Sequence, residues 1–247
     1  MRATRIQLCG MLAVEIKSRR CEDELPGRQG RLLFVYLAAN RSRPVARGEL
    51  VDVLWPREPP RTAETTMAGV LSRLRHVLGE NVLHGREQLR LVLPADTWID
   101  VEVAIRAIHE AETAVHTGDW PRAWIGGRVA LDVSRREFAT GCDAPWIDER
   151  RRSLGALQAS ALECIGEAGL GLGGTEIAAA ERCGRALVAL EPFRESGYRL
   201  LMRALEARGN AADALAVYDQ LRHVLRDELG TAPSPATQAL HKHLLAV

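Results

Sequence analysis

A chain of 247 residues is long for one compact domain and sufficient for two domains that each bury a core. A hydrophobic fraction of 47% and a charged fraction of 26% exclude a largely disordered chain. The net charge of +1 is unevenly spread, because residues 1–90 carry 16 basic against 10 acidic side chains. A nucleic-acid-binding module and chance variation explain this imbalance about equally well.

The first predicted elements are a hairpin and two helices. Apolar residues alternate on both sides of Gly10 within residues 4–17, which predicts two short strands. After the break at Pro26, the spacing of Leu32, Leu33, Tyr36 and Leu37 predicts a helix that ends at Asn40. A shorter helix with Leu50, Val53 and Leu54 inward is stopped by Trp55-Pro56.

The clearest periodicity lies in residues 62–78. Apolar residues recur there at spacings of three and four, which predicts an amphipathic helix ended by Gly79. Its opposite face carries small, hydroxyl-bearing and basic side chains. Two strands, 82–83 and 89–93, follow and are joined by a turn in which Gly85 can supply a positive φ. A strand pair, three helices and a terminal hairpin is the order of a winged helix.

Residues after Pro94 predict almost continuous helix. We expect helices at about 100–117, 119–133, 145–170, 175–190, 194–208, 210–229 and 234–246, with breaks at glycine and proline clusters such as 169–174. A shift of 35 residues aligns the following pairs: Gly174 with Gly209, Ala179 with Ala214, Cys183 with Tyr218, Ala186 with Leu221, Leu190 with Leu225. That period is typical of tetratricopeptide helix pairs. The expected fold class is mainly α with small β elements.

Several short motifs together resemble one family. In the N-terminal part they are Leu25-Pro26-Gly27, Arg43-Pro44-Val45, Leu54-Trp55, Leu71-Ser72-Arg73-Leu74-Arg75 and Leu78-Gly79. In the C-terminal part they are Trp146 with Arg150, Leu190-Glu191-Pro192, Leu201-Met202, Ala204-Leu205, Ala214-Leu215 with Tyr218, Glu228-Leu229-Gly230 and Pro233-Ser234-Pro235. In this order they resemble SARP-type regulators, the actinobacterial activators of antibiotic gene clusters.

The resemblance implies two domains. Residues 1–96 would form an OmpR/PhoB-type winged helix-turn-helix that binds DNA, and residues 97–247 a tetratricopeptide-like bacterial transcriptional activator domain. It also implies binding to direct repeats near promoters and contact with RNA polymerase holoenzyme or its sigma factor. The chain would be a small member that lacks the ATPase, sensor or forkhead-associated domains of larger relatives.

Four positions depart from the family pattern. Gln88-Leu89 replaces the usual Gly-Tyr pair of the wing, and Ile105 replaces a phenylalanine. Ala46 stands where a serine commonly begins the second helix, which removes a helix cap worth about 1 kcal/mol. These changes affect the expected wing tip more than the expected fold.

The helix at 62–78 is the predicted recognition helix, because the major groove admits one helix and distinguishes all four base pairs. Short polar side chains and a glycine allow close approach to bases, whereas arginine reaches guanine or phosphate; the sequence does not decide which. Arg75 lies toward the edge of the buried face. The candidate DNA-binding residues are Arg61, Thr65, Thr66, Gly69, Ser72, Arg73 and Arg75, with Arg86 and Arg90 in the wing.

Other constellations favour structural roles. The glycine run 169–174 follows a helix and lacks a Gly-Lys-Ser/Thr ending, so we expect a helix connection and no phosphate loop. His241 and His243 lack spaced metal-ligand partners, and Arg150-Arg151-Arg152 reads as a charged helix face. Five scattered cysteines without a CxxC pair indicate reduced thiols. We therefore expect no enzyme, no cofactor and no metal site.

The expected function is a transcriptional activator that binds double-stranded promoter DNA of a biosynthetic gene cluster as a dimer. Without a signal-peptide run or an apolar run of membrane-spanning length, we expect a cytoplasmic, nucleoid-associated protein without membrane partners. Two alternatives stay open. The helical part could be a peptide-binding adaptor with the winged helix as scaffold, or its groove could hold a small ligand that is sensed.

Overall fold

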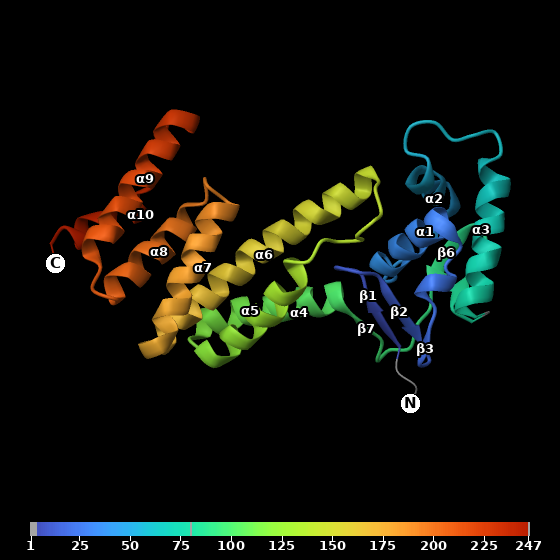
Figure 1. The fold of residues 1–247 in the computed structure, drawn as a ribbon, viewed down its shortest axis with the longest axis horizontal. Coiled ribbons are helices and arrows are strands. Elements are labelled where there is room, and N and C mark those ends of the chain that lie inside the picture. The colour runs from blue at the N-terminus through green and yellow to red at the C-terminus, as the bar shows by residue number, and fades with distance from the viewer. Residues whose placement is uncertain (1–3, 80, 247) are drawn as a thin grey trace. The chain divides into compact units, whose positions relative to one another are not determined.

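The computed structural model describes residues 4–79 and 81–246, and the chain is mainly helical with short strands (Figure 1). The outermost ends of the two predicted domains, residues 1–3 and 247, lie outside the described residues. The chain divides into two compact units, one of residues 1–103 with 133–154 and one of residues 104–132 with 155–247. The domain boundary predicted after residue 96 would instead give two continuous segments. That boundary remains a prediction.

The described residues of the first unit include two small sheets and the whole of helices α1, α2 and α3. Its elements are β1 (Arg5–Gln7), β2 (Ala13–Ile16), β3 (Arg19–Arg20), η1 (Glu22–Glu24), α1 (Gly27–Ala39), β4 (Val45–Ala46), α2 (Arg47–Leu54), α3 (Ala63–Leu78), β5 (Leu83–His84), β6 (Gln88–Leu91) and β7 (Trp98–Ile99). The predicted N-terminal hairpin, helices and wing strands are confirmed.

The N-terminal sheet has the order β3-β2-β1-β7. Ile6 pairs with Val14 in the antiparallel hairpin and with Ile99 of the parallel strand β7. Asp100 follows directly, is fully buried, and accepts hydrogen bonds from the amides of Leu8 and Cys9, each 2.9 Å long. The carboxylate therefore ties the start of the next helix to the end of the first strand.

The second sheet, β4-β6-β5, forms the wing and joins it to the helices. Val45 pairs with Leu89, and Leu83 with Leu91. Ala46 provides no side-chain cap for α2, as the sequence predicts, but the Arg47 amide donates to the Glu87 carbonyl at 2.9 Å. A wing carbonyl thus satisfies the first amide of the helix, whereas a serine cap would accept from the second or third.

The three helices of this unit close around one apolar core. Phe34 of α1, Leu50 of α2 and Met67 of α3 are all completely buried. Leu50 and Met67 fall on the apolar faces that the sequence periodicity predicts, whereas Phe34 is not among the positions predicted for the first helix. The packing fixes α3 with its opposite face toward solvent, which is the arrangement a recognition helix requires.

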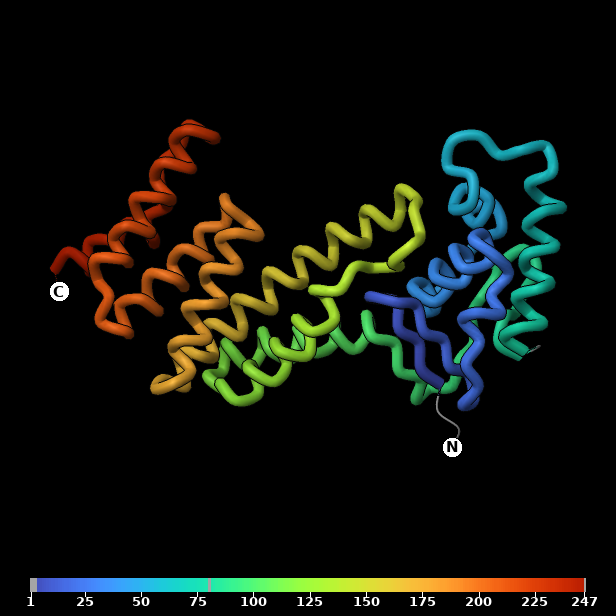
Figure 2. Tube along the Cα trace, viewed as in Figure 1, coloured from blue at the N-terminus to red at the C-terminus, as the bar shows by residue number. Residues whose placement is uncertain are grey.

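The second unit is helical. Its elements, some of which begin or end in the first unit, are α4 (Asp100–Thr117), α5 (Trp120–Ser134), α6 (Pro145–Leu172), η2 (Gly174–Glu176), α7 (Ile177–Leu190), α8 (Glu195–Ala207), α9 (Ala211–Leu229) and α10 (Pro235–Leu244). Helices α7, α8 and α9 pack as successive antiparallel neighbours (Figure 2). The seven helices predicted after Pro94 are therefore present, with ends shifted by a few residues.

The predicted glycine connection is shorter than expected. Helix α6 continues to Leu172, so Gly169 and Gly171 are helical and only Gly173 and Gly174 adopt positive φ. An added Cβ at Gly171 would lie 2.3 Å from the ring of Trp120. Glycine at that position serves helix packing, and the reading of this run as a phosphate loop has no support.

The 35-residue repeat matches two successive helix pairs, α7–α8 and α9–α10. Cys183 and Tyr218 are both buried, as are Ala179 and Ala214. The last two aligned pairs differ, because Leu221 and Leu225 are buried whereas the residues aligned with them, Ala186 and Leu190, are exposed. The repeat is thus tetratricopeptide-like in its first half and diverges in its second.

Candidate nucleic-acid interface

Helix α3 buries one side and exposes the other. Its apolar positions Met67, Leu71 and Leu74 are at most 1% exposed. The helix ends where Gly79 adopts φ of +97° and donates its amide to the Arg75 carbonyl. The exposed side carries the candidate residues Thr65, Gly69, Ser72 and Arg73, while Thr66 is half-buried.

Small side chains occupy the middle of the exposed face. An added Cβ at Gly69 would meet no atom within 4 Å among the described residues, so no protein contact requires glycine there. Thr65 and Ser72 present hydroxyls to solvent on the same side of the helix. This face can therefore approach another surface closely and offer hydrogen-bond donors and acceptors to it.

Arg75 does not share this face. Its guanidinium donates to the carbonyl of Leu83 at 3.3 Å and to that of Gly85 at 2.7 Å. Gly85 has φ of +91°, and an added Cβ would lie 1.8 Å from the Gln88 carbonyl oxygen, so the turn requires glycine. Arg75 therefore ties the wing hairpin to α3, a position that the sequence indicated only as an edge of the buried face.

The cations around α3 fall into two groups. Arginines away from its exposed face hold carboxylates; an example is Arg47, which binds Glu64 at 2.7 Å. That pair also neutralises the acidic side chain in the first turn of α3. In contrast, several exposed arginines have no carboxylate within 4 Å in the ranges 4–79 and 81–246: Arg28, Arg61, Arg73, Arg86 and Arg90.

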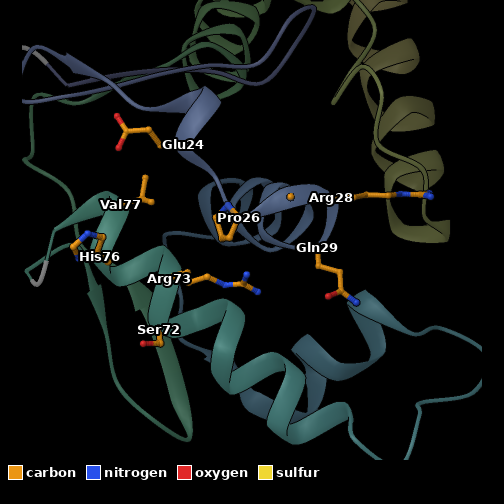
Figure 3. Close-up of a pocket in the computed structure, with 9 residues that line it drawn as sticks. Glu24, Pro26, Arg28, Gln29, Ser72, Arg73, His76 and Val77 are labelled. Atoms are coloured by element: carbon orange, nitrogen blue, oxygen red, sulfur yellow. The ribbon is translucent and has the colours of Figure 1, made fainter.

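A groove of about 720 Å³ lies between the first turn of α1 and the C-terminal half of α3 (Figure 3). Arg73 extends from α3 toward Pro26, and Gln29 extends from α1 toward the same space. Sequence reasoning missed this groove, because its walls are more than 40 residues apart in the chain. It is lined by Glu24, Pro26, Gly27, Arg28, Gln29, Ser72, Arg73, His76 and Val77.

The remaining sequence candidates have structural partners. His241 stacks on Tyr218 with ring centroids 3.8 Å apart, and His243 lies 2.9 Å from a carboxylate oxygen of Glu206. Arg150 donates to the carbonyl of Ala39 at 3.4 Å. Within the described ranges, no group of three or more His, Cys, Asp or Glu side chains is arranged to hold a metal ion.

All five cysteines are buried and none forms a disulfide. Burial raises the pKa of the Cys9 and Cys164 thiols to about 12 and that of Cys21 and Cys183 to about 11. Because the thiolate is the reactive form, these thiols pack as small apolar side chains. Among the described residues, no helix is both long enough and apolar enough to span a membrane.

Comparison with known proteins places this arrangement in a family. Residues 99–245 match the bacterial transcriptional activator domain. The chain is 36% identical over 220 residues to the regulatory protein AfsR of Streptomyces coelicolor, covering 88% of this chain and 22% of AfsR. It is 30% identical over 246 residues to the transcriptional regulator RedD of the same organism, covering 87% of this chain and 63% of RedD.

A solved structure shares the fold. Mycobacterium tuberculosis EmbR, in complex with a low-affinity phosphopeptide, superposes with a TM-score of 0.85 at 24% identity, covering all of this chain and 66% of that one. The chain thus spans between about a fifth and two thirds of the length of these relatives. AfsR, RedD and EmbR are regulatory proteins, and the family is one of regulators, not enzymes. This chain belongs to the bacterial transcriptional activator domain family, as a SARP-type regulator.

Proposed function

We propose that this chain is a sequence-specific DNA-binding transcriptional activator, with α3 as the helix that enters the major groove. The exposed face of α3 carries the proposal. It combines short hydroxyl side chains, a glycine with open space before it, and Arg73, which has no carboxylate partner among the described residues. A face of this kind fits base edges in its centre and phosphates at its margins.

The proposed roles follow the placement of each residue. Thr65, Gly69 and Ser72 face base edges, and Arg61 contacts a phosphate near the start of the helix. Thr66 is half-buried and contributes packing as much as contact. The wing residues Arg86 and Arg90 are exposed and reach the minor groove or its phosphates, while Arg75 positions that wing.

Binding as a dimer to direct repeats fits the small area of one recognition helix. Joining two modules on one DNA converts the second binding event into an intramolecular one and raises overall affinity without new contacts. The helical unit would then contact RNA polymerase holoenzyme or its sigma factor. These partners, the biosynthetic gene cluster and a cytoplasmic, nucleoid-associated location follow from the family resemblance.

The test is a footprint of the purified chain on DNA upstream of the genes beside its own. We expect protection of a short sequence that occurs at least twice in tandem, with affinity that falls steeply as salt rises. Thr113→Ala, on an exposed part of α4 in the second unit, is a matched control for Thr65→Ala. Equal footprints for Thr65→Ala, Thr113→Ala and the parent chain would exclude the assigned face.

A second candidate function rests on a groove in the helical unit. It measures about 630 Å³ between α7, α8 and α9, and its walls include Val188, Tyr198, Leu201 and Val217. An apolar groove between tetratricopeptide-like helices fits an adaptor that binds a peptide, or a regulator that senses a small ligand. An adaptor has no need of the polar face of α3, so absence of any footprint at moderate salt would favour this alternative.

A further inference from the structure

Two arginines leave α3 on different sides. Arg73 and Arg75 are two residues apart, which separates their directions by about 200° around a helix. Arg75 turns to the wing, where its guanidinium binds two backbone carbonyls. Arg73 turns to the opposite side, into the groove that α3 forms with α1 (Figure 3). Neither arginine therefore occupies the centre of the exposed face, which holds Thr65, Gly69 and Ser72.

The groove beside Arg73 has an excess of positive charge. Glu24 is the carboxylate of its lining, and Arg19 holds both oxygens of that carboxylate at 2.8 Å. Arg28 and Arg73 have no carboxylate partner within the described ranges, and the first turn of α1 carries no acidic side chain. Among the described residues, the one hydrogen bond of Arg73 goes to the Gly69 carbonyl of its own helix, at 3.4 Å. The groove therefore carries positive charge that no described carboxylate neutralises.

The shape of the groove fits an extended nucleic-acid backbone better than a compact ligand. Ser72, Arg73 and His76 are all exposed along its α3 wall, so the groove opens to solvent over about a turn of helix. It is also continuous with the face proposed to meet DNA, because Ser72 and Arg73 belong to both. When a helix lies in the major groove, a phosphate strand borders it on each side.

We infer that this groove receives one phosphate strand of the bound duplex, and that Arg73 contacts phosphate and does not read a base. The inference rests on the proposed DNA-binding function and settles a choice that the sequence left open. Gln29 contributes a neutral hydrogen-bond donor from α1, whereas the side chain of Arg28 points away from Arg73 (Figure 3). Sequence discrimination is left to the small residues in the centre of α3.

The experiment measures Arg73→Ala on the footprinted sequence and on an unrelated duplex of equal length, across a salt series. A lost phosphate contact should weaken both complexes by the same factor, roughly tenfold at 0.1 M salt, and flatten the log–log salt slope by about 0.9. The ratio of the two affinities should stay unchanged. Arg182→Ala, which removes an exposed arginine from α7, is the charge-matched control and should alter neither quantity.

A neutral methylphosphonate placed along the site gives a second, independent readout. At one position it should weaken the parent chain and have no further effect on Arg73→Ala. A fall in the affinity ratio with unchanged binding to the unrelated duplex would overturn the inference, because it would make Arg73 a base reader. Unchanged binding to both duplexes would overturn it as well. If the parent chain protects no DNA at all, the proposed function itself fails.

Discussion

Gly69→Ala separates a binding role from a folding role at the centre of α3. Gly69 is an interior helical residue with space for a methyl group, since an added Cβ meets no described atom within 4 Å. Alanine is favoured over glycine in a helix interior by about 1 kcal/mol. The substitution should therefore raise the free energy of unfolding by up to about 1 kcal/mol, which corresponds to roughly 2–4 °C in Tm for a protein of this size.

The same methyl group should weaken DNA binding. If α3 lies against base edges, the added carbon occupies the space through which the backbone approaches them. A disturbed base contact costs about 1–3 kcal/mol, or roughly 5- to 150-fold in affinity for the operator. The variant would thus be more stable and bind less tightly, a combination that general damage to the fold cannot produce.

Thermal unfolding and a gel-shift titration on the footprinted sequence measure the two effects. Gly155→Ala is the matched control, because Gly155 is also helical, lies in α6, and has no described atom within 4 Å of an added Cβ. It should raise stability and leave operator affinity unchanged. Operator affinity of Gly69→Ala equal to that of the parent would refute the placement of Gly69 against DNA.

Three further changes test one contact of the wing and two contacts elsewhere in the fold. Asp100→Asn should lower the free energy of unfolding by about 2–3 kcal/mol in a urea titration, because a buried acceptor of backbone amides is replaced by a group that also donates. Burial opposes ionisation of Glu195, but hydrogen bonds from Thr237 and Ser234 outweigh it and lower its pKa. Its stabilising effect is therefore complete above the unfolded pKa and lost as pH falls below about 4.5, a loss that Glu195→Gln should remove from the pH profile of stability. Arg75→Met should weaken operator binding while making the wing amides exchange faster with deuterium, since the two carbonyl contacts are lost.

Each of these expectations can be contradicted directly. Unchanged urea midpoints for Asp100→Asn would show that its hydrogen bonds contribute nothing net. A parent chain and a Glu195→Gln variant that lose stability in parallel on acidification would remove Glu195 from the acid response. Wing exchange rates unaffected by Arg75→Met would leave Arg75 without the positioning role.

The sequence predicts the elements whose information is local. Residues 62–78 have strong helical periodicity, and the structure places the helix at Ala63–Leu78. The strands β4 and β7 were missed because each has two residues, too few for any alternation, and each pairs with a strand more than 40 residues away. Their existence depends on tertiary packing that no sequence window contains.

The same contrast between local sequence information and tertiary packing applies to the candidate site. Exposure of Thr65, Ser72 and Arg73 follows from periodicity and is confirmed. Helix geometry separates Arg73 from Arg75, but the partners that they meet could not be predicted, because the groove and the wing carbonyls depend on where α1 and the wing pack against α3. The predicted break at 169–174 fails partly for a similar reason, since the ring of Trp120 makes close contact at Gly171 within a continuous helix.

The most direct test of the central claim is a footprint of the parent chain beside its Gly69→Ala and Gly155→Ala variants on the same upstream DNA. We expect a protected tandem repeat for the parent and for Gly155→Ala, and weakened protection of the same bases for Gly69→Ala. Protection that is identical for all three, or absent for the parent at moderate salt, would contradict the claim that α3 reads DNA.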